Sequence, residues 1–160
     1  MNKVTPVCHG TFTLNRSWAA PPARVFQAWA DPHLKRQWFG PPPGEWTAVR
    51  TAVEFRPGGL EIHEGRFTTS GVTTLYEGRF HLIEENQRLI FAYDLHLSGR
   101  FHSVTLASLV LEANGARTDV SYTEQVVYLD GTDGTAQRRH GTEYLFGKID
   151  ALMTTGDGTR

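Results

Sequence analysis

The sequence predicts an α+β fold in which a curved antiparallel sheet of seven strands wraps around one long C-terminal helix. Between residues 47 and 127 apolar side chains recur at every second position, and short turns separate these segments. After Asp130-Gly131 the period changes to that of a helix. One helix is narrower than such a sheet, so we expect shorter elements near the N-terminus to cover the rest of the buried face.

The N-terminal part predicts one strand and two short helices. Residues 11–18 alternate as a strand does, and Pro21-Pro22 opens a helix because proline is tolerated in the first helical turn. Asp31-Pro32 ends this helix and caps a second one. The second helix ends at the aromatic stretch Trp38–Pro41, which we expect to form a lid over the open part of the sheet.

The remaining strands follow from alternation and turn chemistry. Arg56–Gly59 is typical of a type II turn, and Asn114-Gly115 is the strongest hairpin signal in the chain. The predicted strands span residues 47–55, 60–67, 72–84, 88–97, 101–112 and 117–127. The final helix has about 18–20 residues, with Thr132 or Asp133 as its cap. Its apolar stripe comprises Thr142, Leu145, Phe146, Ile149, Leu152 and Met153. We expect one domain over residues 1–160, with its core at 11–153 and a disordered tail at 154–160.

Composition excludes several classes of protein. The 160 residues are 39% hydrophobic and 21% charged, which is typical of a globular domain. A net charge of −1 with scattered basic residues argues against nucleic-acid binding. Cys8 is the only cysteine, so no intramolecular disulfide can form. The N-terminus lacks the apolar core of a signal peptide, and no run approaches the ~20 apolar residues of a membrane helix. We therefore expect a cytoplasmic protein that does not bind membranes.

A set of short motifs occurs in a family-specific order. They are VFQAWADP (25–32), WFGP (38–41), FRPGG (55–59), EGRF (77–80), RLIF (88–91), TDVSYTEQ (118–125) and RRHGTEYLFGKIDALM (138–153). The set resembles the SRPBCC (START/Bet v-like) superfamily, and within it the branch of activator of heat-shock-protein-90 ATPase homologue C-terminal-like domains. The resemblance implies a helix-grip fold with a deep pocket between sheet and helix. Members include binders of lipids and other hydrophobic ligands, aromatase/cyclase-like proteins, antibiotic self-resistance proteins and co-chaperone domains.

The chain departs from the family pattern in its last helix. Many relatives have Gly-Trp where this chain has Gly141-Thr142. The smaller Thr142 either enlarges the pocket or leaves space that Tyr144 and Phe146 fill. Strand parity and the helix stripe predict the residues that line the pocket and bind its ligand: Trp29, Trp38, Phe55, Tyr76, Phe80, Phe91, Tyr93, Tyr122, Glu124, Thr142 and Tyr144.

Polar residues on the predicted inner face leave alternatives open. Alternation places Glu124 inside, where it could serve acid–base chemistry. Alternatively, a bulge turns it outward, or Arg138 or Arg139 pairs with it. The tyrosine hydroxyls either orient a ligand or reach backbone carbonyls. None of the histidines has the spacing of a metal motif, so we predict no metal and no cofactor.

These observations favour a binding protein for a small hydrophobic or aromatic molecule over an enzyme, and we assign no catalytic residue. The alternatives are a cyclase- or hydrolase-like enzyme that uses Glu124 with a tyrosine or histidine, and a co-chaperone-like interaction module. A chaperone partner follows only from the family name. We expect a monomer or a weak homodimer.

Overall fold

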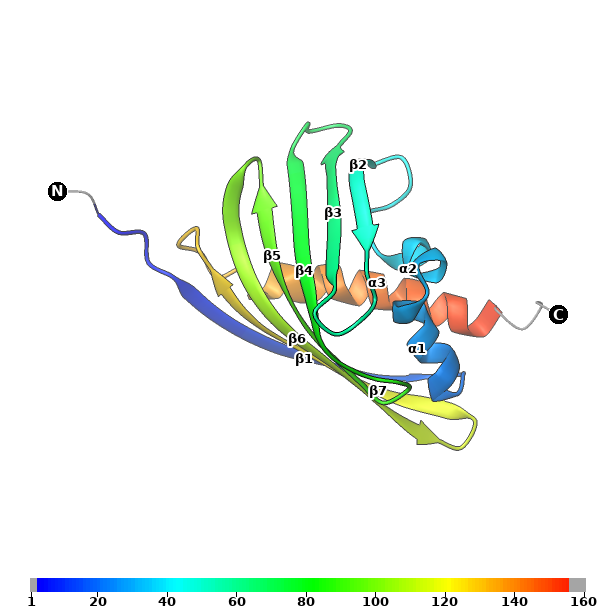
Figure 1. Ribbon diagram of the computed structural model, residues 1–160. Helices are drawn as coiled ribbons and strands as arrows, with labels where there is room; N and C mark the ends of the chain where they lie inside the picture. The colour runs from blue at the N-terminus through cyan, green and yellow to red at the C-terminus, as the bar shows by residue number, and fades with distance from the viewer. Residues whose placement is uncertain (1–2, 156–160) are drawn as a thin grey trace.

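The computed structural model describes residues 3–155 and confirms the predicted fold (Figure 1). Its elements are β1 (Cys8–Trp18), α1 (Pro22–Ala30), α2 (Pro32–Trp38), β2 (Trp46–Val53), β3 (Leu60–Phe67), β4 (Thr73–Glu84), β5 (Arg88–Leu97), β6 (Arg100–Asn114), β7 (Arg117–Tyr128) and α3 (Thr135–Thr155). The seven strands form one antiparallel sheet in the order β1-β7-β6-β5-β4-β3-β2. Strands β2 to β7 are therefore a continuous meander, and β1 joins it by pairing with β7.

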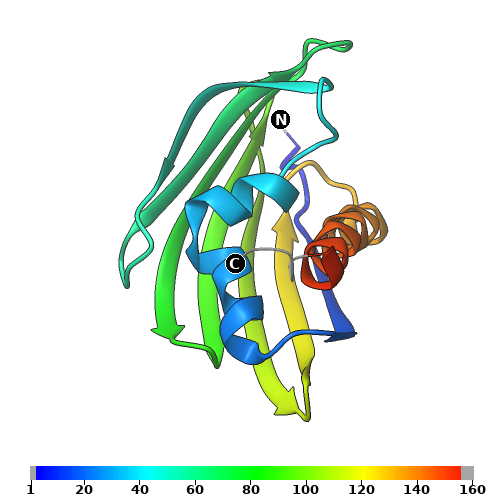
Figure 2. The ribbon, with the colours of Figure 1, turned by 90° about the vertical axis from the view of Figure 1, so that its right-hand side faces the viewer.

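The sheet curves so that α3 lies across its inner face (Figure 1). Figure 2 shows the sheet as one wall and α3 as the opposite wall, with α1 and α2 beside the helix. Irregular registers occur between Ala48 and Arg50, between Phe80 and Leu82, and between Leu95 and His96. Because bulges bend a strand and increase its twist, they help the sheet to curl.

Two predicted boundaries are corrected at the ends of the chain. The first strand begins at Cys8 rather than at residue 11, because pairing with β7 continues to the Cys8–Tyr128 pair. The last helix continues to Thr155, so residues 154 and 155 are helical although the sequence assigned them to a tail. The rest of that predicted tail, 156–160, lies outside the described residues.

Caps and one buried hydrogen bond fix the two short helices. The Asp31 side chain accepts a hydrogen bond of 2.8 Å from the backbone N–H of His33, as a cap of α2 does. The Trp38 indole donates a hydrogen bond of 2.7 Å to the carbonyl of Ala28 in α1. This bond ties α1 to α2.

Aromatic rings form the core where α1, α2, α3 and the sheet meet. The ring centroid of Trp29 lies 6.2 Å from that of Trp18, 5.0 Å from that of Trp38 and 6.0 Å from that of Phe146. All four side chains are buried. This cluster joins β1, α1, α2 and α3 through contacts between their aromatic rings.

Candidate ligand-binding cavity

A cavity of about 970 Å³ lies between the inner face of the sheet, α3, and α2 with the loop that follows it. Nine of the eleven predicted pocket residues line it: Trp29, Trp38, Tyr76, Phe91, Tyr93, Tyr122, Glu124, Thr142 and Tyr144. Residues 38–41, predicted as a lid, also line it. The void is of the size that small-molecule sites have in proteins.

Phe55 and Phe80, the other two predicted residues, do not line the cavity. Phe55 has its ring centroid 5.0 Å from Phe80 and 5.8 Å from Phe26 of α1. Strand parity placed Phe80 correctly on the inner face, where it is buried. However, Phe55 packs between Phe80 and Phe26 of α1, so both rings pack in or against the solid core.

Glu124 lies at the inner end of the cavity and is 2% exposed. The registers of β7 with β1 and β6 are unbroken, so simple alternation holds and the side chain points inward. Its carboxylate accepts hydrogen bonds from Tyr122 at 2.5 Å and from Tyr93 at 3.0 and 3.1 Å. The predicted partner Arg138 places Nη1 3.7 Å from Oε1, whereas no such ion pair joins Arg139 to Glu124 within residues 3–155.

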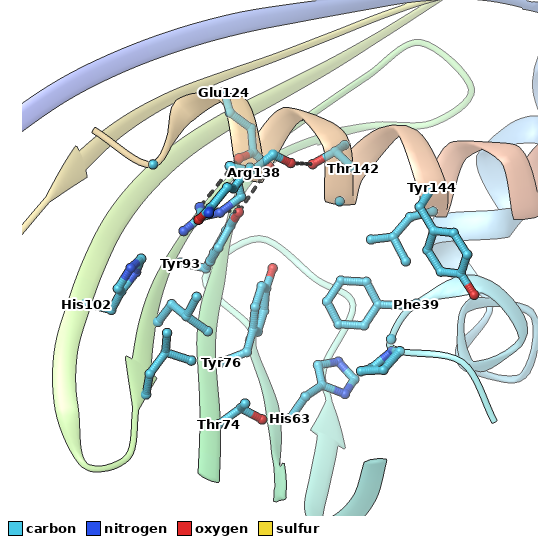
Figure 3. Close-up of a pocket in the computed structure, with 18 of the residues that line it drawn as sticks. Phe39, His63, Thr74, Tyr76, Tyr93, His102, Glu124, Arg138, Thr142 and Tyr144 are labelled. Carbon is cyan, nitrogen blue, oxygen red and sulfur yellow. Dashed lines mark hydrogen bonds and ion pairs between the residues drawn. The ribbon is translucent and has the colours of Figure 1, made fainter. Parts of the chain in front are cut away.

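Arg138 connects this site to α3 and to the neighbouring strands. Its guanidinium donates to the hydroxyl of Tyr93 at 3.0 Å, to that of Thr105 at 3.0 Å and to that of Ser103 at 2.8 Å. Figure 3 shows Arg138 reaching down from α3 between Glu124 and Tyr93. We call Glu124, Tyr93, Tyr122 and Arg138 the Glu124 network. It holds α3 at a fixed distance from the sheet beside the cavity.

Burial raises the pKa of Glu124, and the hydrogen bond from Tyr122, the charge of Arg138 and the bond from Tyr93 offset only part of this effect. Between pH 4.5 and the folded-state pKa, Glu124 is therefore protonated in the folded protein. In the unfolded chain, where its pKa is near the ordinary 4.5, it has lost this proton. The contribution of Glu124 to the free energy of unfolding is fully present when the pH is below this ordinary pKa. It is lost as the pH rises through the folded-state pKa.

This sign gives a test of the buried carboxyl. We expect the free energy of unfolding of the unmodified protein, minus that of Glu124→Gln, to fall as the pH rises from 4.5, because only the unmodified protein contains this group. Urea denaturation followed by tryptophan fluorescence between pH 4.5 and 7.5 measures the difference. Parallel pH profiles for the two proteins would contradict the raised pKa.

A second polar group at the other side of the cavity was missed by the sequence analysis. Lys35 of α2 places Nζ 2.6 Å from Oε2 of Glu61 in β3, and His63 places Nε2 2.8 Å from the same oxygen. Lys35 is 3% exposed and Glu61 is 1% exposed. We call these three residues the Lys35 cluster. Lys35 and His63 line the cavity.

In the Lys35 cluster the pKa of the Glu61 carboxyl is shifted in the opposite direction from that of Glu124. Burial alone would raise the pKa of Glu61, but the charge of Lys35 and the bonds from His63 and Lys35 lower it below its ordinary value. A signal for this cluster existed in the strand pairing. Residues opposite each other share a face, and Glu61 and His63 lie opposite Gly78 and the inward-facing Tyr76.

Residues 3–155 contain neither a group of side chains that could hold a metal ion nor a helix that could span a membrane. No three histidine, cysteine, aspartate or glutamate side chains in this range lie where they could hold an ion together. None of the described helices is both long and apolar enough to cross a bilayer.

Comparison with known proteins decides the family. The family described as "Activator of Hsp90 ATPase homolog 1-like protein" matches residues 19–154. The chain belongs to this family. This confirms the resemblance drawn from the ordered motifs, and proteins with this superfamily's fold generally bind hydrophobic ligands. No curated protein matches the chain.

Solved structures of other proteins match nearly the whole length of this Activator of Hsp90 ATPase homolog 1-like protein. An uncharacterised protein from Rhizobium leguminosarum is 36% identical, with 93% of this chain and 97% of that chain covered and a TM-score of 0.86. Protein Mll3558 from Rhizobium loti is 31% identical, with 91% and 98% covered and a TM-score of 0.83. DynU16, from the dynemicin biosynthetic locus, is 18% identical, with 91% and 48% covered and a TM-score of 0.66, and it shares the fold.

Proposed function

We propose that the protein binds a small hydrophobic or aromatic molecule in the cavity between the sheet and α3. The observation that carries the proposal is the cavity of about 970 Å³ between the sheet and α3, which nine of the eleven predicted pocket residues line. A protein interior normally packs at the density of an organic crystal. A void of this size next to a closely packed aromatic cluster is therefore a feature that a ligand would fill.

The chemistry of the wall supports an aromatic occupant. Rings from α1, α2, β4, β5, β7 and α3 face the cavity, including Trp29, Phe39, Phe91 and Phe146. Aromatic pairs gain stabilisation in offset and edge-to-face arrangements beyond the area they bury. The Glu124 network and the Lys35 cluster supply polar groups on two sides of this wall, as expected for groups that orient a ligand.

The position of Glu124 favours binding over the acid–base alternative. Its two oxygens already accept hydrogen bonds from two tyrosines, and Arg138 lies beside them. A carboxylate held in this way positions Tyr93 and Arg138, and its oxygens are already engaged although its side chain lines the cavity. Within residues 3–155 no observation favours the co-chaperone alternative.

Calorimetric titration with 2-acetylnaphthalene tests the proposal. We expect saturable one-to-one binding with a negative change in heat capacity, because apolar surface leaves water. Native mass spectrometry of protein purified from its source organism should also show a retained small molecule. The proposal fails if neither a retained mass nor binding of 2-acetylnaphthalene and other neutral aromatic compounds is found up to their solubility limits.

A further inference from the structure

The Tyr76 hydroxyl is a polar group that the protein leaves available among the aromatic rings of the cavity. Its side chain is 9% exposed and lines the cavity. The hydroxyls of Tyr93 and Tyr122 are used within the Glu124 network, whereas that of Tyr76 has no hydrogen-bond partner among residues 3–155. In Figure 3 it points into the space between Tyr93 and Phe39 and carries no dashed line. A ligand that covered this hydroxyl without offering an acceptor would leave a buried donor unpaired, so an acceptor on the ligand is favoured there.

Among residues 3–155, two buried atoms of other lining residues also have no hydrogen-bond partner, the Tyr128 hydroxyl and Nδ1 of His102. Their rings lie 6.0 Å apart beside the exposed Asp130, whereas Tyr76 stacks on Tyr93.

The ring of Tyr76 is held in one orientation by its neighbours. It stacks on Tyr93 at a centroid distance of 4.5 Å and an interplanar angle of 22°. Phe39 meets it edge-on at 5.3 Å. Gly78 makes room for the ring, because a Cβ at that position would lie 2.9 Å from Cε1 of Tyr76. The hydroxyl is therefore a preorganised donor.

The hydroxyl also stays protonated. Burial raises the pKa of Tyr76 well above its ordinary value of 10.0, and the charge of Glu61 on one side and that of Glu124 on the other add to this effect. Ring contacts with His63 at 5.7 Å and with Tyr93 at 4.5 Å place Tyr76 between the Lys35 cluster and the Glu124 network. At neutral pH the group therefore acts as a donor to a ligand.

The buried charges around the cavity are already paired. Lys35 is 2.6 Å from Glu61, and Arg138 is 3.7 Å from Glu124. Two more acidic groups that line the cavity, Asp130 and Asp133, lie at its exposed rim, where a negative charge repels anions. Asp130 is 3.6 Å from Nε2 of His102, and Asp133 accepts hydrogen bonds from Thr135. A charged ligand would lose its hydration and find no free counter-charge inside, which is unfavourable.

From this geometry we infer that Tyr76 is the specificity-determining residue of the cavity, and that the ligand is an uncharged aromatic compound with a hydrogen-bond acceptor, such as a carbonyl oxygen, beside its ring. The inference rests on the proposed function and names the ligand's class. The acceptor binds the Tyr76 hydroxyl, and the ring lies against the aromatic wall. Arg138 stays with Glu124 and does not bind an anion.

Three probes of nearly equal shape test this inference by calorimetry at pH 7. 2-Acetylnaphthalene has the acceptor, 2-isopropylnaphthalene lacks it, and 2-naphthoate replaces the methyl ketone by a carboxylate. We expect Tyr76→Phe to weaken binding of 2-acetylnaphthalene roughly three- to tenfold, since one net hydrogen bond is lost. Binding of 2-isopropylnaphthalene should change less than about twofold. In the unmodified protein, 2-naphthoate should bind at least roughly tenfold more weakly than 2-acetylnaphthalene.

Two further variants keep the test decisive. Thr118→Val removes a buried hydroxyl that donates to the carbonyl of Ala20, away from the cavity, and should leave the affinities unchanged. If Tyr76→Phe does not fold, Gly78→Ala displaces the same ring and should lower the affinity for the ketone selectively.

The outcomes separate this inference from the proposed function. Equal weakening of both neutral probes by Tyr76→Phe, or binding of 2-naphthoate as tight as that of the ketone, would overturn the inference and leave a ligand-binding cavity. Absence of binding by all three probes would count against the cavity as a binding site and against the inference with it.

Discussion

Replacement of Lys35 by methionine is expected to lower the free energy of unfolding at pH 7 by about 3–5 kcal/mol. The two atoms of the ion pair with Glu61 lie 2.6 Å apart, and both side chains are buried. Methionine keeps most of the aliphatic volume against the ring of Phe39, whose centroid is 4.9 Å from Nζ. The loss therefore comes mainly from a carboxylate left buried without its cation. Urea denaturation followed by circular dichroism measures it.

The pH dependence of this variant should be reversed in sign. In the unmodified protein the lowered pKa of Glu61 contributes stability that is present above the ordinary value of 4.5 and is lost as the pH falls through the folded-state pKa. Without Lys35, burial becomes the dominant effect and raises the pKa of Glu61. The variant should then become more stable as the pH falls from 7 towards 4.5.

Two controls identify the mechanism. Lys35→Met combined with Glu61→Leu should recover much of the lost stability, because no buried charge remains. Arg36→Met, at the exposed neighbouring position, should change the free energy of unfolding by less than about 0.5 kcal/mol. A single Lys35→Met variant as stable as the Arg36 control would show that the ion pair contributes little.

The fold could be predicted because its signals are local. Two-residue periodicity, the Asn114-Gly115 turn and the helical stripe after residue 131 each act over a few residues, and a meander joins neighbours in sequence order. Strand and helix ends were less certain, since they depend on pairing across the sheet. Cys8 is in a strand because it lies opposite Tyr128, a residue far away in the sequence.

The residues that line the cavity could be predicted only where alternation along a single strand fixes the direction of the side chain. Alternation along β7 placed Tyr122 and Glu124 correctly because the registers of that strand are unbroken. Phe80 was also turned inward as expected, but its ring packs on Phe55, which in turn contacts Phe26 of α1. The path of that helix is not encoded near Phe80. The Lys35 cluster joins a helix to a strand 26 residues away, so single-strand periodicity does not reveal the pair.

The binding function depends most directly on the small side chain at Thr142, which is 7% exposed and lines the cavity from α3. We expect Thr142→Trp to place an indole in the void and weaken binding of 2-acetylnaphthalene roughly tenfold to a hundredfold, as expected when apolar burial of one large side chain is lost. Calorimetric titration measures the change. An indole that occupies a void displaces no packed neighbour, so the free energy of unfolding should change by less than about 1.5 kcal/mol.

A matched variant separates occupancy of the cavity from a general effect of tryptophan on α3. Ala151 lies on the exposed side of the same helix and does not line the cavity, so Ala151→Trp adds the same indole outside it. This variant should bind 2-acetylnaphthalene as the unmodified protein does. If Thr142→Trp folds normally and also binds with unchanged affinity, the ligand lies elsewhere on the molecule. If both variants lose binding, the indole acts through the helix itself, and the space beside Thr142 does not determine affinity.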